Sequence, residues 1–123
     1  MTRIACIVPV YNGKRDLNRL LDSLQAQLVA CDVLIVDSSS SDGSQELAQD
    51  RLGRVYVIPS IQFNHGGTRQ LMVDRNPEYD IYVFMTQDAY VTDPNALSQL
   101  VEPFNDPLVG AVCGRQLPHL HAT

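Results

Sequence analysis

Short apolar runs alternate with amphipathic stretches along this chain. The first run, residues 4–10, is continuous and rich in β-branched side chains, which is typical of a strand buried on both faces. Pro59 ends another run of this kind. The pattern predicts strands at residues 4–10, 33–36, 55–58, 81–85 and 109–113.

Helical periodicity fills the gaps between these runs. Five leucines recur at helical spacing, which predicts one apolar face on a first helix. They are Leu17, Leu20, Leu21, Leu24 and Leu28. Three further helices are predicted to start at a turn, at a glycine pair, and at an N-cap followed by proline. These starts are Asp42-Gly43-Ser44, Gly66-Gly67 and Asp93-Pro94.

Strands that alternate with helices indicate an α/β fold with a parallel sheet and right-handed crossovers. Open sheets of this kind bind ligands beyond the carboxyl ends of the strands, where the strand order reverses. The residues that directly follow the first four strands are therefore expected to face one crevice. They are Tyr11 and Asn12, Asp37 and Ser38, residues 61–65, and residues 86–88.

The composition restricts the partners. A chain of 123 residues fits one domain, and an apolar share of 45% supports an ordinary core. Nine basic and fourteen acidic side chains give a formal net charge of −5. This balance argues against nucleic acid as a partner, because phosphate backbones bind to basic faces. A site for an anionic ligand would need backbone amides, a few arginines or a metal ion.

The cysteines and the chain start indicate no special chemistry. The chain has an odd number of cysteines and no CxxC pair; the three are Cys6, Cys31 and Cys113. Buried reduced thiols are therefore favoured over disulfides or metal ligands. The apolar run at the start is too short for a signal peptide or a membrane span. His119 and His121 are expected in a tail, because no third metal ligand of matching spacing is evident.

Asp37 ends a wholly apolar strand and precedes four serines. A carboxylate at this strand end can accept hydrogen bonds from a ribose hydroxyl or a base N–H. The alternative is a turn-forming side chain that caps the next helix, but this role suits Asp42 better because Asp42 directly precedes Gly43. Ligand contact is therefore the favoured role for Asp37.

Gln87 and Asp88 follow the fourth predicted strand. Asp88 could hold a divalent cation, since Mg²⁺ commonly uses one or two carboxylates together with substrate phosphate oxygens. A loop carboxylate that bonds to nearby backbone amides is an equally good interpretation of the local sequence.

Residues 64–69 form the most unusual segment. Two glycines before a helix let a ligand approach the backbone closely. Arg69 is expected in the first turn of that helix, where a basic side chain indicates an anion or a pairing with an acid such as Asp37 or Asp88. His65 suits a structural role as well as a ligand contact.

Taken together, these segments resemble the family 2 glycosyltransferases. Residues 7–12 look like the first strand and nucleotide loop of that family, and residues 36–43 look like its second nucleotide loop. Residues 86–89 stand where the family has its metal-binding DxD motif, although Thr86 replaces the first acid. Within the family, residues 63–69, 86–89 and 114–118 resemble the rhamnosyltransferase branch, with Gln70 in place of its usual Asn.

The resemblance implies a GT-A fold, which is a Rossmann-like three-layer sandwich with a mostly parallel sheet. Residues 1–118 would form the nucleotide-sugar-binding part, and residues 119–123 a tail or the start of an acceptor half that the chain lacks. The general base would lie beyond this chain, so the fragment alone is expected to be inactive. The implied metal is Mg²⁺ or Mn²⁺ at Asp88. The implied substrate-binding residues are Pro9, Tyr11, Asn12, Asp37, Ser39, Gly66, Arg69 and Gln87.

The implied activity is inverting transfer of L-rhamnose from a nucleotide diphosphate donor, dTDP-rhamnose, in surface polysaccharide synthesis. The acceptor would be a saccharide or a lipid-linked molecule. The enzyme would work in the cytoplasm, at the inner face of the membrane, with peripheral membrane association through regions that this chain lacks.

Three other classes of protein are alternatives. A sugar nucleotidyltransferase has a similar glycine-rich loop, but after its first strand, whereas Gly66-Gly67 follows the third predicted strand here. A receiver-type phosphoacceptor domain needs acidic residues after its first strand, and this chain has Tyr11 and Asn12 there. A nucleotide-binding module without catalysis stays open.

Overall fold

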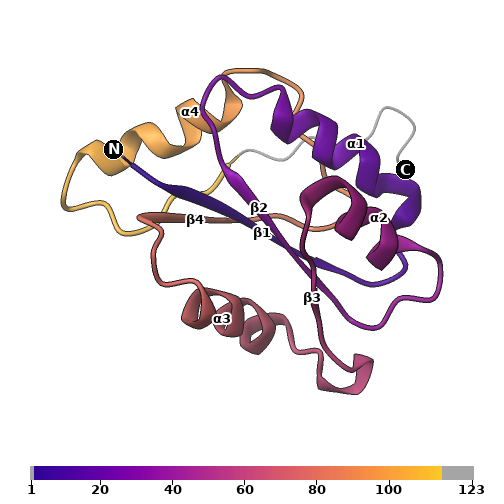
Figure 1. Cartoon of the computed structure of the whole chain (residues 1–123). Helices are drawn as coiled ribbons and strands as arrows, with labels where there is room; N and C mark the ends of the chain where they lie inside the picture. The colour runs from indigo at the N-terminus through magenta and orange to yellow at the C-terminus, as the bar shows by residue number, and fades with distance from the viewer. Residues whose placement is uncertain (1, 115–123) are drawn as a thin grey trace, which may run out of the picture.

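The computed structural model describes residues 2–114 and shows a parallel sheet with helices on both faces (Figure 1). The strands are β1 (Ile4–Val10), β2 (Asp32–Asp37), β3 (Tyr56–Val57) and β4 (Ile81–Phe84). The helices are α1 (Lys14–Gln25), α2 (Ser44–Leu52), α3 (His65–Arg75) and α4 (Ala96–Val101), with 3₁₀ turns η1 (Ser60–Gln62) and η2 (Glu102–Asn105). The predicted α/β fold with a parallel sheet is confirmed.

The strand order β3-β2-β1-β4 makes β1 a central strand of the sheet. Its register runs from Ala5 opposite Asp32 to Val10 opposite Asp37 in β2, and from Ile4 opposite Ile81 to Ile7 opposite Phe84 in β4. The chain moves outward from β1 through β2 to β3 and then returns to place β4 on the other side of β1. The strand order therefore reverses between β1 and β4, which is where such sheets bind ligands.

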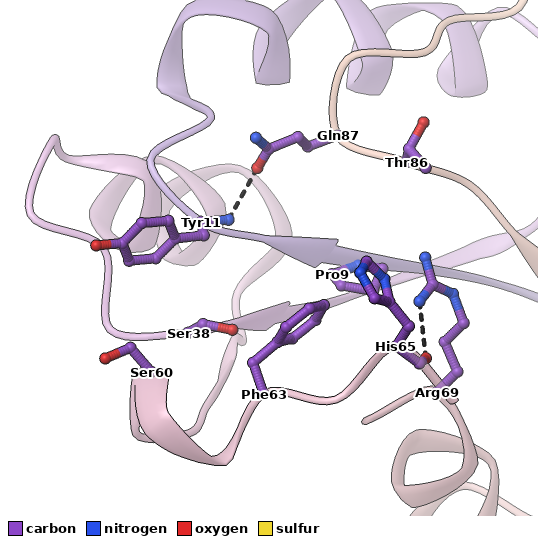
Figure 2. A pocket seen from close by; sticks show the side chains of 9 residues that line it. All are labelled: Pro9, Tyr11, Ser38, Ser60, Phe63, His65, Arg69, Thr86 and Gln87. Carbon is purple, nitrogen blue, oxygen red and sulfur yellow. Dashed lines mark hydrogen bonds between the residues drawn. The ribbon is translucent and has the colours of Figure 1, made fainter. Parts of the chain in front are cut away.

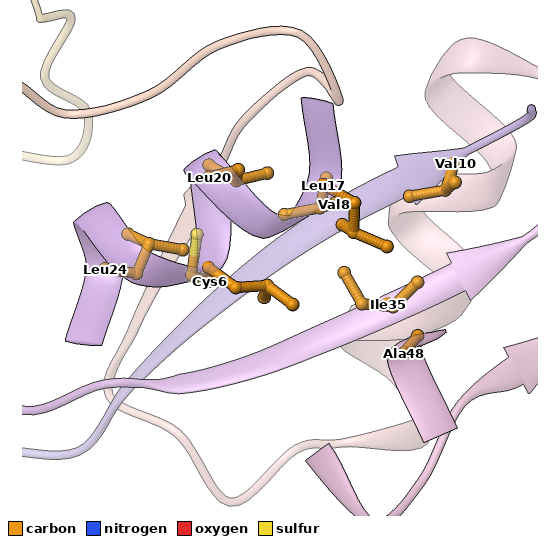
Figure 3. Packing of buried hydrophobic residues seen from close by; sticks show 9 residues of the cluster. Cys6, Val8, Val10, Leu17, Leu20, Leu24, Ile35 and Ala48 are labelled. Carbon is orange, nitrogen blue, oxygen red and sulfur yellow. The ribbon is translucent and has the colours of Figure 1, made fainter. Parts of the chain in front are cut away.

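The alternation of side chains along β1 builds a core on each face of the sheet. Cys6, Val8 and Val10 pack with the buried leucines of α1 and with Ala48 of α2 (Figure 3). Ala5 and Ile7 belong to the opposite cluster, which contains Met72 of α3 and Tyr79. All seven residues of β1 are buried, as the continuous apolar run predicts for a strand covered on both faces. Burial raises the pKa of the Cys6 thiol well above its ordinary value, and the nearby Cys31 raises it further.

Several predicted helices and strands extend further than the observed ones. Leu28 lies beyond the end of α1 and is 72% exposed, because the helix ends at Gln25 and the Leu28 amide instead donates to the carbonyl of Pro94. The predicted strand 55–58 pairs only at Tyr56 and Val57, since the chain bends there toward η1. The strand predicted to end at Met85 ends at Phe84.

The predicted N-cap of the last helix was misplaced. Asp93 accepts from the amide of Asn95 at 2.8 Å, so its side chain closes a turn before the helix instead of capping it. α4 consequently begins at Ala96 and not at Pro94. The local sequence Asp-Pro is compatible both with a helix N-cap at Asp93 and with a turn closed by Asp93. The hydrogen bonds from this segment to the end of α1 select the turn.

Residues 109–113 do not form the predicted fifth strand, and the described part of the chain contains four strands. An apolar run becomes a strand only when a neighbouring backbone completes its hydrogen bonds, and here Val109 donates to Asp106 in a turn. Cys113 is therefore exposed, which corrects its expected burial, while Cys6 is buried and Cys31 half-buried. All three thiols are free, as predicted.

Residues 115–123 lie outside the described residues, and with them His119, His121 and most of the 114–118 motif. Within residues 2–114, no helix combines the length and apolar character that crossing a bilayer requires.

Candidate functional site

A pocket of about 360 Å³ opens at the carboxyl ends of the strands (Figure 2). Its walls come from the end of β1 and from the segments that follow each of the four strands. They are Pro9, Tyr11, Ser38, Ser60, Phe63, His65, Arg69, Thr86 and Gln87. The prediction that the segments after the four strands meet in one crevice is confirmed. Phe63 lies in the range 61–65 that was expected to face the crevice, whereas Ser60, one residue before that range, was missed.

Four of the predicted binding residues line this pocket. Pro9, Tyr11, Arg69 and Gln87 do so, whereas Asn12, Asp37, Ser39 and Gly66 do not. The predicted metal ligand Asp88 also lies outside the lining, one residue beyond Gln87.

Asp37 is fully buried and holds the loop that follows β2. Its two carboxylate oxygens accept from the backbone amide of Ser40 at 2.8 Å and from the Ser40 hydroxyl at 2.6 Å. The Ser40 hydroxyl oxygen in turn accepts from the amide of Asn12 at 2.9 Å, and Asn12 accepts from the amide of Ser41 at 2.8 Å. This network joins the loops that follow β1 and β2. Direct ligand contact by Asp37 stays a prediction.

Two residues in these loops have left-handed backbone conformations. Asn12 has φ 48° and Ser39 has φ 61°, which non-glycine residues adopt at a cost. The Asn12 side chain is bonded to Ser41, and the Ser39 hydroxyl donates to the carbonyl of Ile58 at 2.8 Å. These bonds hold the loops that follow β1 and β2, and contact of Asn12 or Ser39 with a ligand stays a prediction.

Asp42 joins the amino ends of two helices. Its carboxylate accepts from the amide of Lys14, the first residue of α1, and from the amide of Ser44, the first residue of α2, both at 3.0 Å. The Ser44 hydroxyl accepts from the amide of Gly13 at 3.0 Å. The predicted turn-forming role of Asp42 at the start of α2 is thus confirmed, but the N-cap position of α2 is Gly43, and the sequence did not reveal the contact with α1.

These contacts favour the ionised form of Asp42. Desolvation alone would raise its pKa, but the hydrogen bonds from Ser44 and Lys14 outweigh it and lower the pKa below the ordinary value. The stabilisation from Asp42 is therefore present above the ordinary carboxyl pKa and is lost as the pH falls through the lowered one. The effect on folding is small because the side chain is exposed.

The segment around the glycine pair is held by a reciprocal cap. Asn64 accepts from the amide of Gly67 at 2.8 Å, while the Thr68 hydroxyl accepts from the amide of Asn64 at 3.1 Å. α3 accordingly starts at His65, so both glycines lie inside its first turn and not before it. Gly66 is exposed and lies outside the pocket lining. The Asn64 cap was missed, although Asn at such a position is a recognised helix start.

Arg69 is the fifth residue of α3, one turn further along than predicted. Its guanidinium donates to the carbonyl of His65 at 2.8 Å. The expected pairing with Asp37 or Asp88 is not observed, since the ion pairs among residues 2–114 involve other residues. His65 makes an edge-to-face contact with Phe63, with ring centroids 5.0 Å apart, so the two rings form one wall of the pocket.

Asp88 lies in a turn that is closed by the amide of Ala89 donating to Thr86. The side chain is exposed, and within the described range its carboxylate has no hydrogen-bond or ion-pair partner. No group of three or more His, Cys, Asp or Glu side chains gathers into a metal site anywhere in that range. A cation here would therefore take one protein carboxylate and complete its coordination from a ligand, as Mg²⁺ does in many phosphate sites.

Ser38, which was expected to face the crevice, lines the pocket and carries a buried hydroxyl. The residue is 2% exposed, and its backbone amide donates to Val10 at the end of β1. Its hydroxyl oxygen has no hydrogen-bond partner among the described residues. A buried polar atom without a partner costs stability.

Ser38→Ala is expected to raise the free energy of unfolding of the ligand-free chain by about 1 kcal/mol, because it removes this unpaired hydroxyl. Thermal melting measures the change. Ser98→Ala is the matched control, since the Ser98 hydroxyl donates to the carbonyl of Asn95 and its loss should not stabilise the chain. A Ser38→Ala variant that melts below the wild type would show that the hydroxyl has a partner in solution.

The fold and the pocket define a class of protein. An open parallel sheet with helices on both faces and a pocket where the strand order reverses is a ligand-binding architecture, and it agrees with the expected GT-A fold. The chain belongs to glycosyl transferase family 2, whose family model matches residues 5–121.

Two curated relatives match nearly the whole chain. The O-antigen chain rhamnosyltransferase RfbN of Salmonella typhimurium is 44% identical over 98% of this chain and 39% of its own length. The O-antigen chain rhamnosyltransferase WbaN of Salmonella anatum is 41% identical over 97% of this chain and 38% of its own length. The chain thus spans about two fifths of the length of these relatives.

Solved structures support the fold. The mannosyltransferase PcManGT from Pyrobaculum calidifontis, in complex with GDP-Man and Mn²⁺, superposes with a TM-score of 0.72 at 25% identity, over 88% of this chain and 34% of that one. Staphylococcus aureus TarS in complex with UDP-GlcNAc gives a TM-score of 0.67 at 23% identity, over 96% of this chain and 37% of that one.

Proposed function

We propose that this chain is the donor-binding part of an inverting glycosyltransferase that transfers L-rhamnose in the synthesis of an O-antigen-like surface polysaccharide. The observation that carries the proposal is the identity of 44% and 41% to two O-antigen chain rhamnosyltransferases along nearly the whole chain. The pocket supports it, because its volume and its position suit a nucleotide.

The pocket lining offers the contacts that a nucleoside diphosphate needs. The ring of Tyr11 is 54% exposed and, with Phe63, gives an apolar aromatic wall against which a planar base can stack. Arg69 supplies a guanidinium for a polar or anionic group of the donor. The chain as a whole has a net charge of −5, so this local positive charge matters for an anionic ligand.

The residues present fit a divalent ion that arrives with the donor. Asp88 is an exposed carboxylate without a competing partner in the described residues, and it adjoins the pocket through Gln87. A bound Mg²⁺ or Mn²⁺ would offset the charge that grows on the leaving nucleoside diphosphate. The complex of PcManGT with GDP-Man and Mn²⁺ supports this assignment.

The chemistry that follows is a single displacement. A hydroxyl of a saccharide or lipid-linked acceptor attacks the anomeric carbon from the face opposite the leaving group, which inverts the configuration. We infer that the general base comes from residues outside this chain, which spans only 39% of the length of RfbN. The reaction would take place at the cytoplasmic face of the membrane.

The sugar nucleotidyltransferase alternative loses its basis. Its glycine-rich loop would have to face the ligand, whereas Gly66 and Gly67 lie in the first turn of α3 and outside the pocket lining.

Calorimetric titration of the chain with sugar nucleotides in the presence of Mn²⁺ tests the proposal. We expect dTDP-L-rhamnose to bind most tightly among dTDP-L-rhamnose, UDP-GlcNAc and GDP-mannose. Inorganic pyrophosphate with Mn²⁺ is the control ligand, and its weaker binding would show that the base contributes. Preference for another donor would refute the rhamnosyl assignment, and no binding of any nucleotide would refute the function itself.

A further inference from the structure

Gln87 ties the loop after β4 to the loop after β1. Its side-chain oxygen accepts from the backbone amide of Tyr11 at 2.8 Å, across 76 positions of sequence (Figure 2). β1 and β4 are the adjacent strands between which the strand order reverses. The bond therefore joins the two loops at one side of the pocket, whose lining includes both residues.

The direction of this bond is fixed by its partner. A backbone N–H can only donate, so the Gln87 atom that faces Tyr11 must be the carbonyl oxygen and not the amino group. The side chain is thus held in one orientation, with its amino group turned away from Tyr11 (Figure 2).

Gly13 makes room for this arrangement. A Cβ atom at position 13 would lie 2.5 Å from Oε1 of Gln87 and 2.8 Å from its Cδ, which are distances that real Cβ atoms do not have. The backbone of Gly13 has φ −107° and ψ 18°, a conformation open to other residues. The glycine therefore leaves room for the Gln87 side chain in its observed position, and its backbone conformation does not call for glycine.

We infer that Gln87 is a positioning residue for the metal-binding turn. It fixes the turn that carries Asp88 against the loop that carries Tyr11, so that the carboxylate and the base-binding wall keep a set separation. This inference rests on the proposed function, in which Asp88 holds the ion of a nucleoside diphosphate and Tyr11 contacts the base. A ligand that bridges two loops binds best when their separation is fixed beforehand.

The expected signature is a loss of coupling between metal and nucleotide. Calorimetry gives the affinity of the chain for dTDP in Mn²⁺ and in EDTA, and the ratio of the two affinities measures the gain from the metal. Gln87→Ala is expected to lower this ratio about fivefold, as the loss of one intramolecular hydrogen bond would. The affinity in EDTA is measured separately, because Gln87 also lines the pocket.

Two variants at the same position separate the hydrogen bond from the bulk of the side chain. Gln87→Met keeps the length without an acceptor and is expected to lower the ratio as Gln87→Ala does. Gln87→Glu keeps an oxygen that can accept from the Tyr11 amide, and its added negative charge attracts the cation, so it is expected to give a ratio at least as high as that of the wild type.

Gly13→Ala tests the same contact from the other side. Its methyl group would push the Gln87 side chain out of place, so it is expected to lower the ratio as Gln87→Ala does. The double variant should be no worse than Gln87→Ala alone, since both changes remove one interaction. Gly110→Ala is the matched control, because nothing lies within 4 Å of a Cβ there and the ratio should not change.

The possible results of these titrations distinguish failure of the positioning role, of the metal assignment and of the proposed function. The positioning role would be overturned if Gln87→Ala and Gln87→Met both kept the affinity ratio of the wild type. It would also be overturned if the effects of Gly13→Ala and Gln87→Ala on this ratio were additive. Either result would leave the proposed function standing. A wild-type chain that binds dTDP without any gain from Mn²⁺ would overturn the metal assignment and this inference with it. A wild-type chain that binds no nucleotide would overturn the proposed function.

Discussion

Asp88→Asn is expected to reduce the affinity of the chain for dTDP in Mn²⁺ to the level measured in EDTA. Asn keeps the shape and one carbonyl oxygen, but it removes the charge that a hard cation needs. The carboxylate has no partner among the described residues, so its loss should leave the fold intact. Changes around metal ligands already cost 10–100-fold in metal affinity, and loss of the ligand itself should cost at least roughly as much.

The control for this experiment is Asp93→Asn. It makes the same change in net charge at another exposed aspartate, and its oxygen can still accept from the amide of Asn95. It should therefore keep the metal-dependent binding. If Asp88→Asn keeps it as well, Asp88 is an ordinary loop residue and the proposed metal site is wrong.

Asp37→Ala is expected to lower the free energy of unfolding by about 3 kcal/mol. The substitution removes a fully buried carboxylate and leaves both the amide and the hydroxyl of Ser40 without their acceptor. It also releases the hydroxyl that accepts from the amide of Asn12, so the link between the two loops weakens. Urea denaturation measures the change as a lower midpoint with an unchanged slope.

Two further variants show whether the loss comes from this network. Asp37→Asn keeps the size and one acceptor oxygen, and it should lose roughly half as much stability. Ser40→Ala combined with Asp37→Ala should cost less than the sum of the two single changes, because they share the same bonds. A fully stable Asp37→Ala variant would mean that the carboxylate does not hold the loop in solution. Its predicted role in ligand binding would then become the better explanation for its presence.

The local sequence was sufficient for four of the five predicted strands, for the existence of the four helices and for the general place of the site. The continuous apolar run of β1 and the leucine pattern of α1 reflect burial on two faces and on one face, and each pattern is specific to its element. The carboxyl-end rule then located the pocket, because it depends only on strands being parallel. Tyr11 and Gln87 were found in this way, whereas Pro9 was implied by the family resemblance and Arg69 by its place near the start of a helix.

Only the tertiary structure decided which polar side chains bind one another and which face the pocket. Asp37 and Asp88 both follow a strand, yet one is fully buried against Ser40 and the other is exposed. The bond from Tyr11 to Gln87 crosses 76 positions, and no local pattern can indicate it. Residues 109–113 have the composition of a strand but no strand hydrogen bonds. The periodicity of apolar residues indicates which faces of a segment are buried in the core. Hydrogen bonds between loops depend instead on which backbone segments the packing of the whole chain places next to each other.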